Sequence, residues 1–202
     1  MTVETLSAWL LTAMVAFSPP QQHREGEAAA LVRYGEIARD FASVAMDPAE
    51  TPLFEGEMGR AETALLMAAV ASYESGYRKD VDQGVVQGDH GKALCIMQVQ
   101  VFGKTAEKYS RADVMNDRQK CLRTALHRMQ QSFTACKSLK LVNRLAGYTV
   151  GSCQEEDKSK WRTLRALNWW KAHPYVDPPQ AATAEASPAV PAASASASLS
   201  VR

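Results

Sequence analysis

Glu74 is the residue of this sequence whose position best suits acid–base chemistry. It follows the apolar run ALLMAAVASY and precedes Ser75 and Gly76. Partial burial at the end of an apolar helix disfavours the charged carboxylate, which raises its pKa and keeps it protonated near neutral pH. A protonated carboxyl can give its proton to a leaving oxygen, so the position favours a general acid. The alternative is an ordinary exposed glutamate at a helix end.

A second candidate acid, Asp89, lies in the glycine-rich segment 80–92, which we expect to be a loop. Residues 93–101 form the one convincing strand candidate and predict half of a short β-hairpin. Two other loop acids, Asp80 and Asp82, are more simply interpreted as solvated. The four histidines show no metal-ligand spacing, so we expect neither a metal nor another cofactor.

Helical periodicity predicts the elements that position these residues. Apolar residues at three- and four-residue spacing indicate helices over about 25–46 and 60–73, and the second is apolar nearly all round and therefore central. Further helices are expected over 103–109, 113–136, 140–150 and 159–172. The last is basic at Lys158, Lys160, Arg162 and Arg165, which suggests a solvated face, and its tryptophans are expected to cap the core.

The apolar run Leu6–Phe17 is predicted to be a helix of the folded domain. It is too short to cross a bilayer, and Glu4 precedes it where a secretion signal carries basic residues. The length of 202 residues fits one domain, and the net charge of +1 gives no bulk signal for nucleic acid. We therefore expect no nucleic-acid partner, no stable membrane insertion and a monomer. Residues 177–202 are rich in Ala, Ser and Pro, which predicts a disordered tail.

Three short motifs occur in order: Glu74-Ser75-Gly76-Tyr77, then LCIMQV over 94–99, then AGYTVG over 146–151. Together they resemble the soluble-type lytic transglycosylases and the related goose-type lysozymes, over about 60–151. The sequence departs from that family where Leu94-Cys95 replaces the usual Gly-Leu and Thr149 replaces the usual Asn. The loop Gly88-Asp89-His90-Gly91 resembles the loop that precedes the second motif in goose-type lysozymes.

The resemblance implies a mainly α, lysozyme-like helical domain with one small β-hairpin by the cleft. Its catalytic core would span 60–176, with 1–59 as a helical segment packed on it. It also implies a lytic transglycosylase that cuts MurNAc–GlcNAc bonds in peptidoglycan and leaves 1,6-anhydroMurNAc ends. Glu74 would act as general acid and then base, Ser75 would orient it by a hydrogen bond, and Met97, Gln98 and Tyr148 would contact the substrate.

Two alternatives remain open at this point. A goose-type muramidase would use Asp89 to position a water, and a cell-wall-binding protein would keep the cleft without the activity. The implied site of action is the periplasm or cell wall. A phage lysis or virion protein, such as an endolysin, would explain why no clear signal peptide is visible.

Four cysteines lie in the second half of the chain, at 95, 121, 136 and 153. A protein that acts on cell walls works outside a reducing cytosol, so two disulfides are favoured over four free thiols. Of the three possible connectivities, the expected helix positions favour Cys95–Cys121 and Cys136–Cys153.

Overall fold

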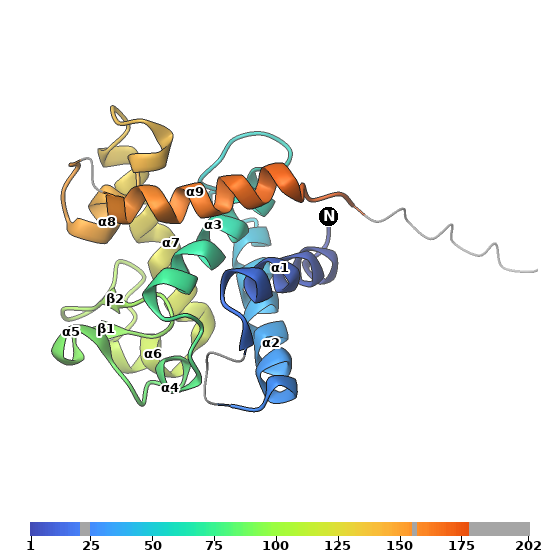
Figure 1. The fold of residues 1–202 in the computed structure, drawn as a ribbon. Helices are drawn as coiled ribbons and strands as arrows, with labels where there is room; N and C mark the ends of the chain where they lie inside the picture. Colours follow the sequence, from blue (N-terminus) through green and yellow to red (C-terminus); the bar gives the residue numbers. More distant parts are fainter. Residues whose placement is uncertain (21–24, 155–156, 178–202) are drawn as a thin grey trace, which may run out of the picture.

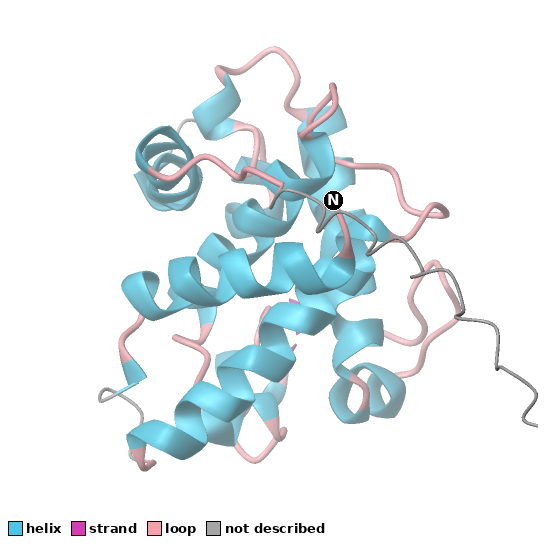
Figure 2. Cartoon of the chain, turned by 90° about the vertical axis from the view of Figure 1, so that its right-hand side faces the viewer, coloured by secondary structure: helices cyan, strands magenta, loops and turns pink. Residues whose placement is uncertain are grey.

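A computed structural model describes residues 1–20, 25–154 and 157–177. In these ranges the chain is mainly helical and contains one two-stranded antiparallel sheet, which confirms the expected mainly α class. Figures 1 and 2 show helices and connecting loops making up almost all of it. The predicted disordered tail lies, from residue 178 on, outside the described residues.

Helix α1 (Val3–Phe17) packs against α2 (Glu27–Met46) and α3 (Gly59–Glu74). The run expected to be a helix of the folded domain is therefore one, with Leu6 and Leu10 fully buried. The side chain of Thr2 caps the start of α1 by accepting a hydrogen bond from the Thr5 N–H. None of the described helices is both long and apolar enough to span a bilayer.

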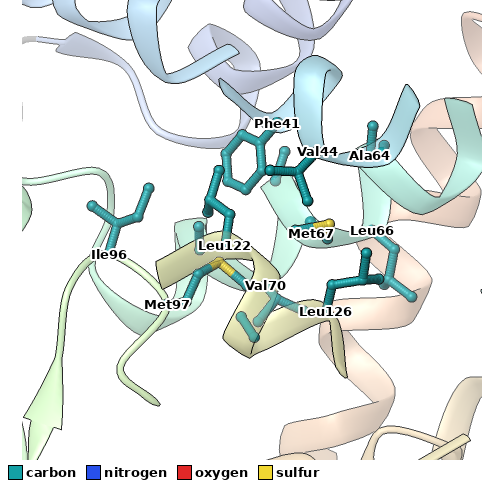
Figure 3. Packing of buried hydrophobic residues seen from close by; sticks show 14 of the residues in the cluster. Phe41, Val44, Ala64, Leu66, Met67, Val70, Ile96, Met97, Leu122 and Leu126 are labelled. Carbon is teal, nitrogen blue, oxygen red and sulfur yellow. The ribbon is translucent and has the colours of Figure 1, made fainter. Parts of the chain in front are cut away.

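Helix α3 is central, as its all-round apolar sequence predicts. It packs against α1, α2 and α9 (Asp157–Ala172), and every residue from Thr63 to Ala71 is buried. Figure 3 shows Met67 and Val70 of α3 among side chains from α2, α7 and the hairpin turn. The helix ends directly after Glu74, because Gly76 and Tyr77 both have left-handed backbone conformations, with φ of 59° and 53°.

The segment expected to be a loop contains two short helical turns, α4 (Lys79–Asp82) and α5 (Gly88–Gly91). The strand region holds both strands of the hairpin rather than half of it. Strand β1 (Ala93–Leu94) pairs with β2 (Val99–Gln100), so the four residues between them form the turn.

The helix expected over 103–109 is absent. Gly103 and Lys108 have left-handed backbone conformations, with φ of 78° and 67°, which are incompatible with a continuous right-handed helix. Helix α6 (Arg111–Asn116) follows, capped by Ser110.

The prediction of a single helix over 113–136 is also wrong, because the chain is divided there between α6 and a separate helix, α7 (Arg118–Ala135). Asp117 is extended there, and its side chain accepts a hydrogen bond from the Lys120 N–H, which starts α7 as a separate helix. The helix expected over 140–150 is divided into a 3-10 turn (Leu141–Asn143) and α8 (Ala146–Val150).

Helix α9 crosses the end of α3 and contacts α8, as Figure 1 shows. Two of its tryptophans, Trp169 and Trp170, pack against the core as expected, whereas Trp161 is 53% exposed.

Both expected disulfides are present, which confirms the pairing. Cys95–Cys121 joins the hairpin turn to α7, and Cys136–Cys153 joins the end of α7 to the segment after α8. Disulfides persist in oxidising environments, so these bonds indicate an extracellular or otherwise oxidising compartment.

Candidate active site

A cleft of about 800 Å³ lies where the end of α3, the hairpin, α7, α8 and α9 meet. Its size falls within the range of roughly 300–1,000 Å³ that is usual for ligand sites. The polar side chains that line it include Glu74, Asp89, Gln98, Gln100, Arg128, Tyr148 and Arg162. Two carboxylates and two guanidinium groups therefore share one cleft.

Glu74 is the most buried carboxylate of the cleft. Its side chain is 19% exposed, and its oxygen Oε1 accepts a hydrogen bond from Nε of Arg162 at 2.9 Å and lies 2.8 Å from Nη2 of the same guanidinium group in an ion pair. Burial raises the pKa of the Glu74 carboxyl above its ordinary value, and the charge and hydrogen bonds of Arg162 offset part of that rise. A carboxyl with a raised pKa in a cleft is suited to proton transfer.

Tyr148 lines the cleft from α8. Its hydroxyl donates to the Met97 carbonyl oxygen at 2.7 Å and not to Glu74. Its backbone N–H donates to the Ser132 hydroxyl of α7, and Gly147 permits this close approach because a Cβ there would lie 3.0 Å from that hydroxyl oxygen. Burial, with the nearby negative charge of Glu74, raises the pKa of the Tyr148 phenol well above its usual range.

Gln98 lines the cleft as expected, and its side-chain amide donates to the Cys95 carbonyl oxygen at 2.9 Å. The Met97 side chain does not line it. It is fully buried in the core near Val70 and Leu122 (Figure 3), because the hairpin turn directs it inward against α3 and α7. The part of Met97 that serves the site is its carbonyl group, which holds Tyr148.

Ser75 is buried and does not orient Glu74. Its hydroxyl donates to the Ala71 carbonyl oxygen and accepts from the Tyr77 N–H, at 3.0 Å and 3.1 Å. The expected bond to Glu74 is absent because these backbone groups at the end of α3 take up the hydroxyl. Ser75 thus fixes the chain reversal that follows Glu74.

Asp89 lies on α5 and is exposed. Its backbone is left-handed, with φ of 46°, and its Oδ2 accepts from the Gln100 side-chain amide at 2.8 Å. The structure therefore brings Asp89 to the same cleft as Glu74 but in a solvated environment. Asp80 pairs with Arg78, and neither it nor Asp82 lines this cleft. The expectation that Asp82 is solvated is wrong, because its side chain is only 5% exposed and is held by an ion pair with Arg118.

Arg162 and Arg128 are the site residues that sequence reasoning missed. Arg162, expected on a solvated face, is only 12% exposed, and Arg128 of α7 donates to the Gln100 carbonyl oxygen at 2.5 Å. One sequence signal could have found Arg162. It lies beside a stripe of small residues, Ser159, Thr163 and Ala166, which is buried and turns that side of α9 toward the core.

Within residues 1–20, 25–154 and 157–177, no group of three or more His, Cys, Asp or Glu side chains is arranged to hold a metal ion. The groups of the described residues that line the cleft and can transfer protons or hold charge are its carboxylates, guanidinium groups and phenol. Comparisons of the chain with protein-family models, with curated proteins and with solved structures found no match.

Proposed function

We propose that the protein is a lytic transglycosylase that cleaves the glycan strands of peptidoglycan. The observation that carries the proposal is Glu74, a largely buried carboxyl with a raised pKa in a cleft of about 800 Å³. It is supported by the convergence on that cleft of residues from all three motif segments, since Gln98 and Tyr148 line it beside Glu74. The two disulfides agree with action at the cell wall or in the periplasm.

The reaction needs one carboxyl group in two roles. Glu74 gives its proton to the glycosidic oxygen between MurNAc and GlcNAc as the C1–O bond breaks, so that GlcNAc leaves with a hydroxyl group. The Glu74 carboxylate then accepts the proton of the MurNAc C6 hydroxyl, whose oxygen attacks C1 and closes the 1,6-anhydro ring. The proton is back on Glu74 at the end, and no water is consumed.

The second candidate function is hydrolysis with Asp89 as the residue that positions water. Asp89 favours it because it is an exposed carboxylate lining the same cleft. Inverting hydrolysis uses two carboxyl groups about 6.5–9.5 Å apart, with a water between them. Its product is a reducing end, which is one water heavier than the anhydro end.

The test is the digestion of purified peptidoglycan sacculi, followed by turbidity and by mass spectrometry of the released muropeptides. Wild type is expected to release anhydro ends, and Glu74→Gln is expected to lose about 10²- to 10⁴-fold in rate because it cannot donate the proton. Glu62→Gln is the matched control, because Glu62 is on the same helix and does not line the cleft.

Four outcomes test the candidates. Anhydro ends that persist in Asp89→Asn support the transglycosylase. Reducing ends that disappear in Asp89→Asn support the muramidase. If Glu74→Gln clears sacculi like wild type, Glu74 has no catalytic role and both proposed mechanisms fail. If neither protein clears them, a cell-wall-binding protein is the better description.

A further inference from the structure

The ion pair between Glu74 and Arg162 is asymmetric. The hydrogen bond from Nε at 2.9 Å and the ion-pair contact of Nη2 at 2.8 Å both go to the same carboxylate oxygen, Oε1. The other oxygen, Oε2, has no hydrogen-bond donor among the residues that the structure describes. The guanidinium group therefore holds the carboxylate through only one of its two oxygens.

This asymmetry determines which oxygen can carry a proton. The Nε–H group that donates to Oε1 and the cationic Nη2 beside it disfavour an O–H on that oxygen, because a protonated oxygen is a poor acceptor for a cationic donor. A proton on Glu74 is thus placed on Oε2. Since Glu74 lines the cleft, Oε2 is the oxygen left to exchange a proton with a bound molecule.

We propose that Arg162 is the positioning residue of the site, which holds Glu74 through Oε1 so that Oε2 donates and later recovers the catalytic proton. The inference rests on the proposed function, because a residue that is acid in one step and base in the next must be held in one orientation through both. Loss of this orientation is costly, since a misplacement of about 1 Å can reduce a rate about 100-fold.

Arg162 also balances the charge of Glu74. Burial favours the neutral carboxyl and Arg162 favours the carboxylate, so the two influences oppose each other, as an acid that must also act as a base requires. The other charged or titratable side chains among the described residues that line the cleft are Tyr148 from α8, Arg128 from α7 and Asp89 from α5. Of the described residues that line the cleft, only Arg162 donates a hydrogen bond to Glu74.

A second arginine of α9 has a different task. Arg165, three residues further on, donates to the Ser72 hydroxyl at 2.9 Å and lies 4.1 Å from the centre of the Tyr73 ring. These contacts dock α9 on α3 in addition to those of Arg162, whose guanidinium group lies 5.3 Å from the centre of the same Tyr73 ring. A substitution of Arg162 should therefore leave α9 held on α3 by Arg165.

The experiment compares Arg162→Gln, Arg162→Lys and Lys160→Gln with wild type. Lys160 is exposed on the same helix and does not line the cleft, so its substitution removes a charge without touching Glu74. Two measurements are made on each full-length protein: the Glu74 carboxyl carbon is titrated by NMR, and muropeptide release from sacculi is followed against pH.

Arg162→Gln is expected to raise the pKa of Glu74, move the alkaline limb of the rate profile to higher pH and lower kcat at least about tenfold. Arg162→Lys keeps the charge, so its pH profile stays near that of wild type. It cannot hold Oε1 by a planar fork, so its kcat still falls several-fold. Lys160→Gln is expected to match wild type in both measurements.

The positioning role is overturned if the titration and the rate profile of Arg162→Gln superimpose on those of wild type while wild type cleaves peptidoglycan. If Arg162→Gln does not fold, Arg162→Lys decides, and a wild-type kcat in that variant rejects the inference. If wild type releases no muropeptides, the proposed function fails instead, and the positioning role fails with it. The NMR titration still reports whether Arg162 controls the charge of Glu74.

Discussion

The two carboxylates of the cleft are held in opposite ways. Glu74 ends a helix that is buried nearly all round, is itself 19% exposed, and is held by a guanidinium group. Asp89 lies on a short turn with left-handed backbone at Asp89 and His90, is exposed, and accepts one hydrogen bond from a neutral amide. One cleft therefore contains a largely buried, ion-paired acid and a solvated one.

The two carboxylates differ in solvation because they lie on different secondary-structure elements, and not because Glu and Asp side chains differ. Desolvation needs a surrounding core, and α3 provides it because α1, α2 and α9 pack around it. The turn that carries Asp89 buries none of its own residues, so water remains available to that carboxylate. The proposed chemistry assigns the proton to Glu74 for this reason, and the comparison can be tested by moving each carboxyl group by one methylene.

The largest effect is expected from Glu74→Asp, which keeps the charge and withdraws the carboxyl from the cleft. It should reduce the rate of muropeptide release about 100-fold, because a carboxyl held about 1 Å from its proper place transfers the proton poorly. Asp89→Glu makes the converse change at the solvated acid and should alter the rate by about twofold or less.

Equal losses in these two variants would contradict the comparison, because they would mean that both carboxylates need precise placement. Such a result would favour the muramidase, in which Asp89 positions a water. Circular dichroism of both proteins would show that the fold is intact.

A smaller effect is expected from Tyr148→Phe, which removes the link between the Glu74 side of the cleft and the hairpin. The Tyr148 hydroxyl donates to the Met97 carbonyl oxygen at 2.7 Å. Its loss leaves that carbonyl without this donor and should lower the free energy of unfolding by about 1–3 kcal/mol, measured by urea denaturation. Tyr109→Phe is the control, because the Tyr109 hydroxyl makes no hydrogen bond within the described residues. A similar loss in both variants would show that the link does not matter.

Much of the fold could be predicted from sequence because its signals are local. The apolar stripes of α1, α2 and α3 recur at helical spacing, and so they were found. The break at Asp117 was missed for an equally physical reason. Aspartate inside a periodic run is compatible with a helix interior, and only its hydrogen bond to the Lys120 N–H shows that it starts a new helix.

Some residues of the candidate site could likewise be predicted from local sequence, and others could not. Glu74, Gln98 and Tyr148 were predicted because each lies in a short motif, and all three line the cleft. Arg162 was missed because its partner is 88 residues away, and no local pattern shows which charge a buried carboxylate will meet. Met97 was placed correctly in sequence but its side chain faces the core, since a motif does not give the direction of each residue.

The smallest effect is expected from Gly88→Ala, which acts on the Asp89 side of the cleft. A Cβ at Gly88 would lie 2.0 Å from the Gln98 side-chain oxygen, so Gln98 must move away from the position in which it lines the cleft. Because only the end of a flexible side chain has to shift, the free energy of unfolding should fall by less than about 1 kcal/mol. KM for glycan strands should rise about threefold, because the substrate would lose part of one neutral hydrogen bond to Gln98.

The control is Gly35→Ala on α2, where a Cβ meets no atom within 4 Å. It should leave KM unchanged and raise the free energy of unfolding by about 0.5–1 kcal/mol. If Gly88→Ala also leaves KM unchanged, Gln98 does not contact the substrate, and only the Glu74 side of the cleft binds it.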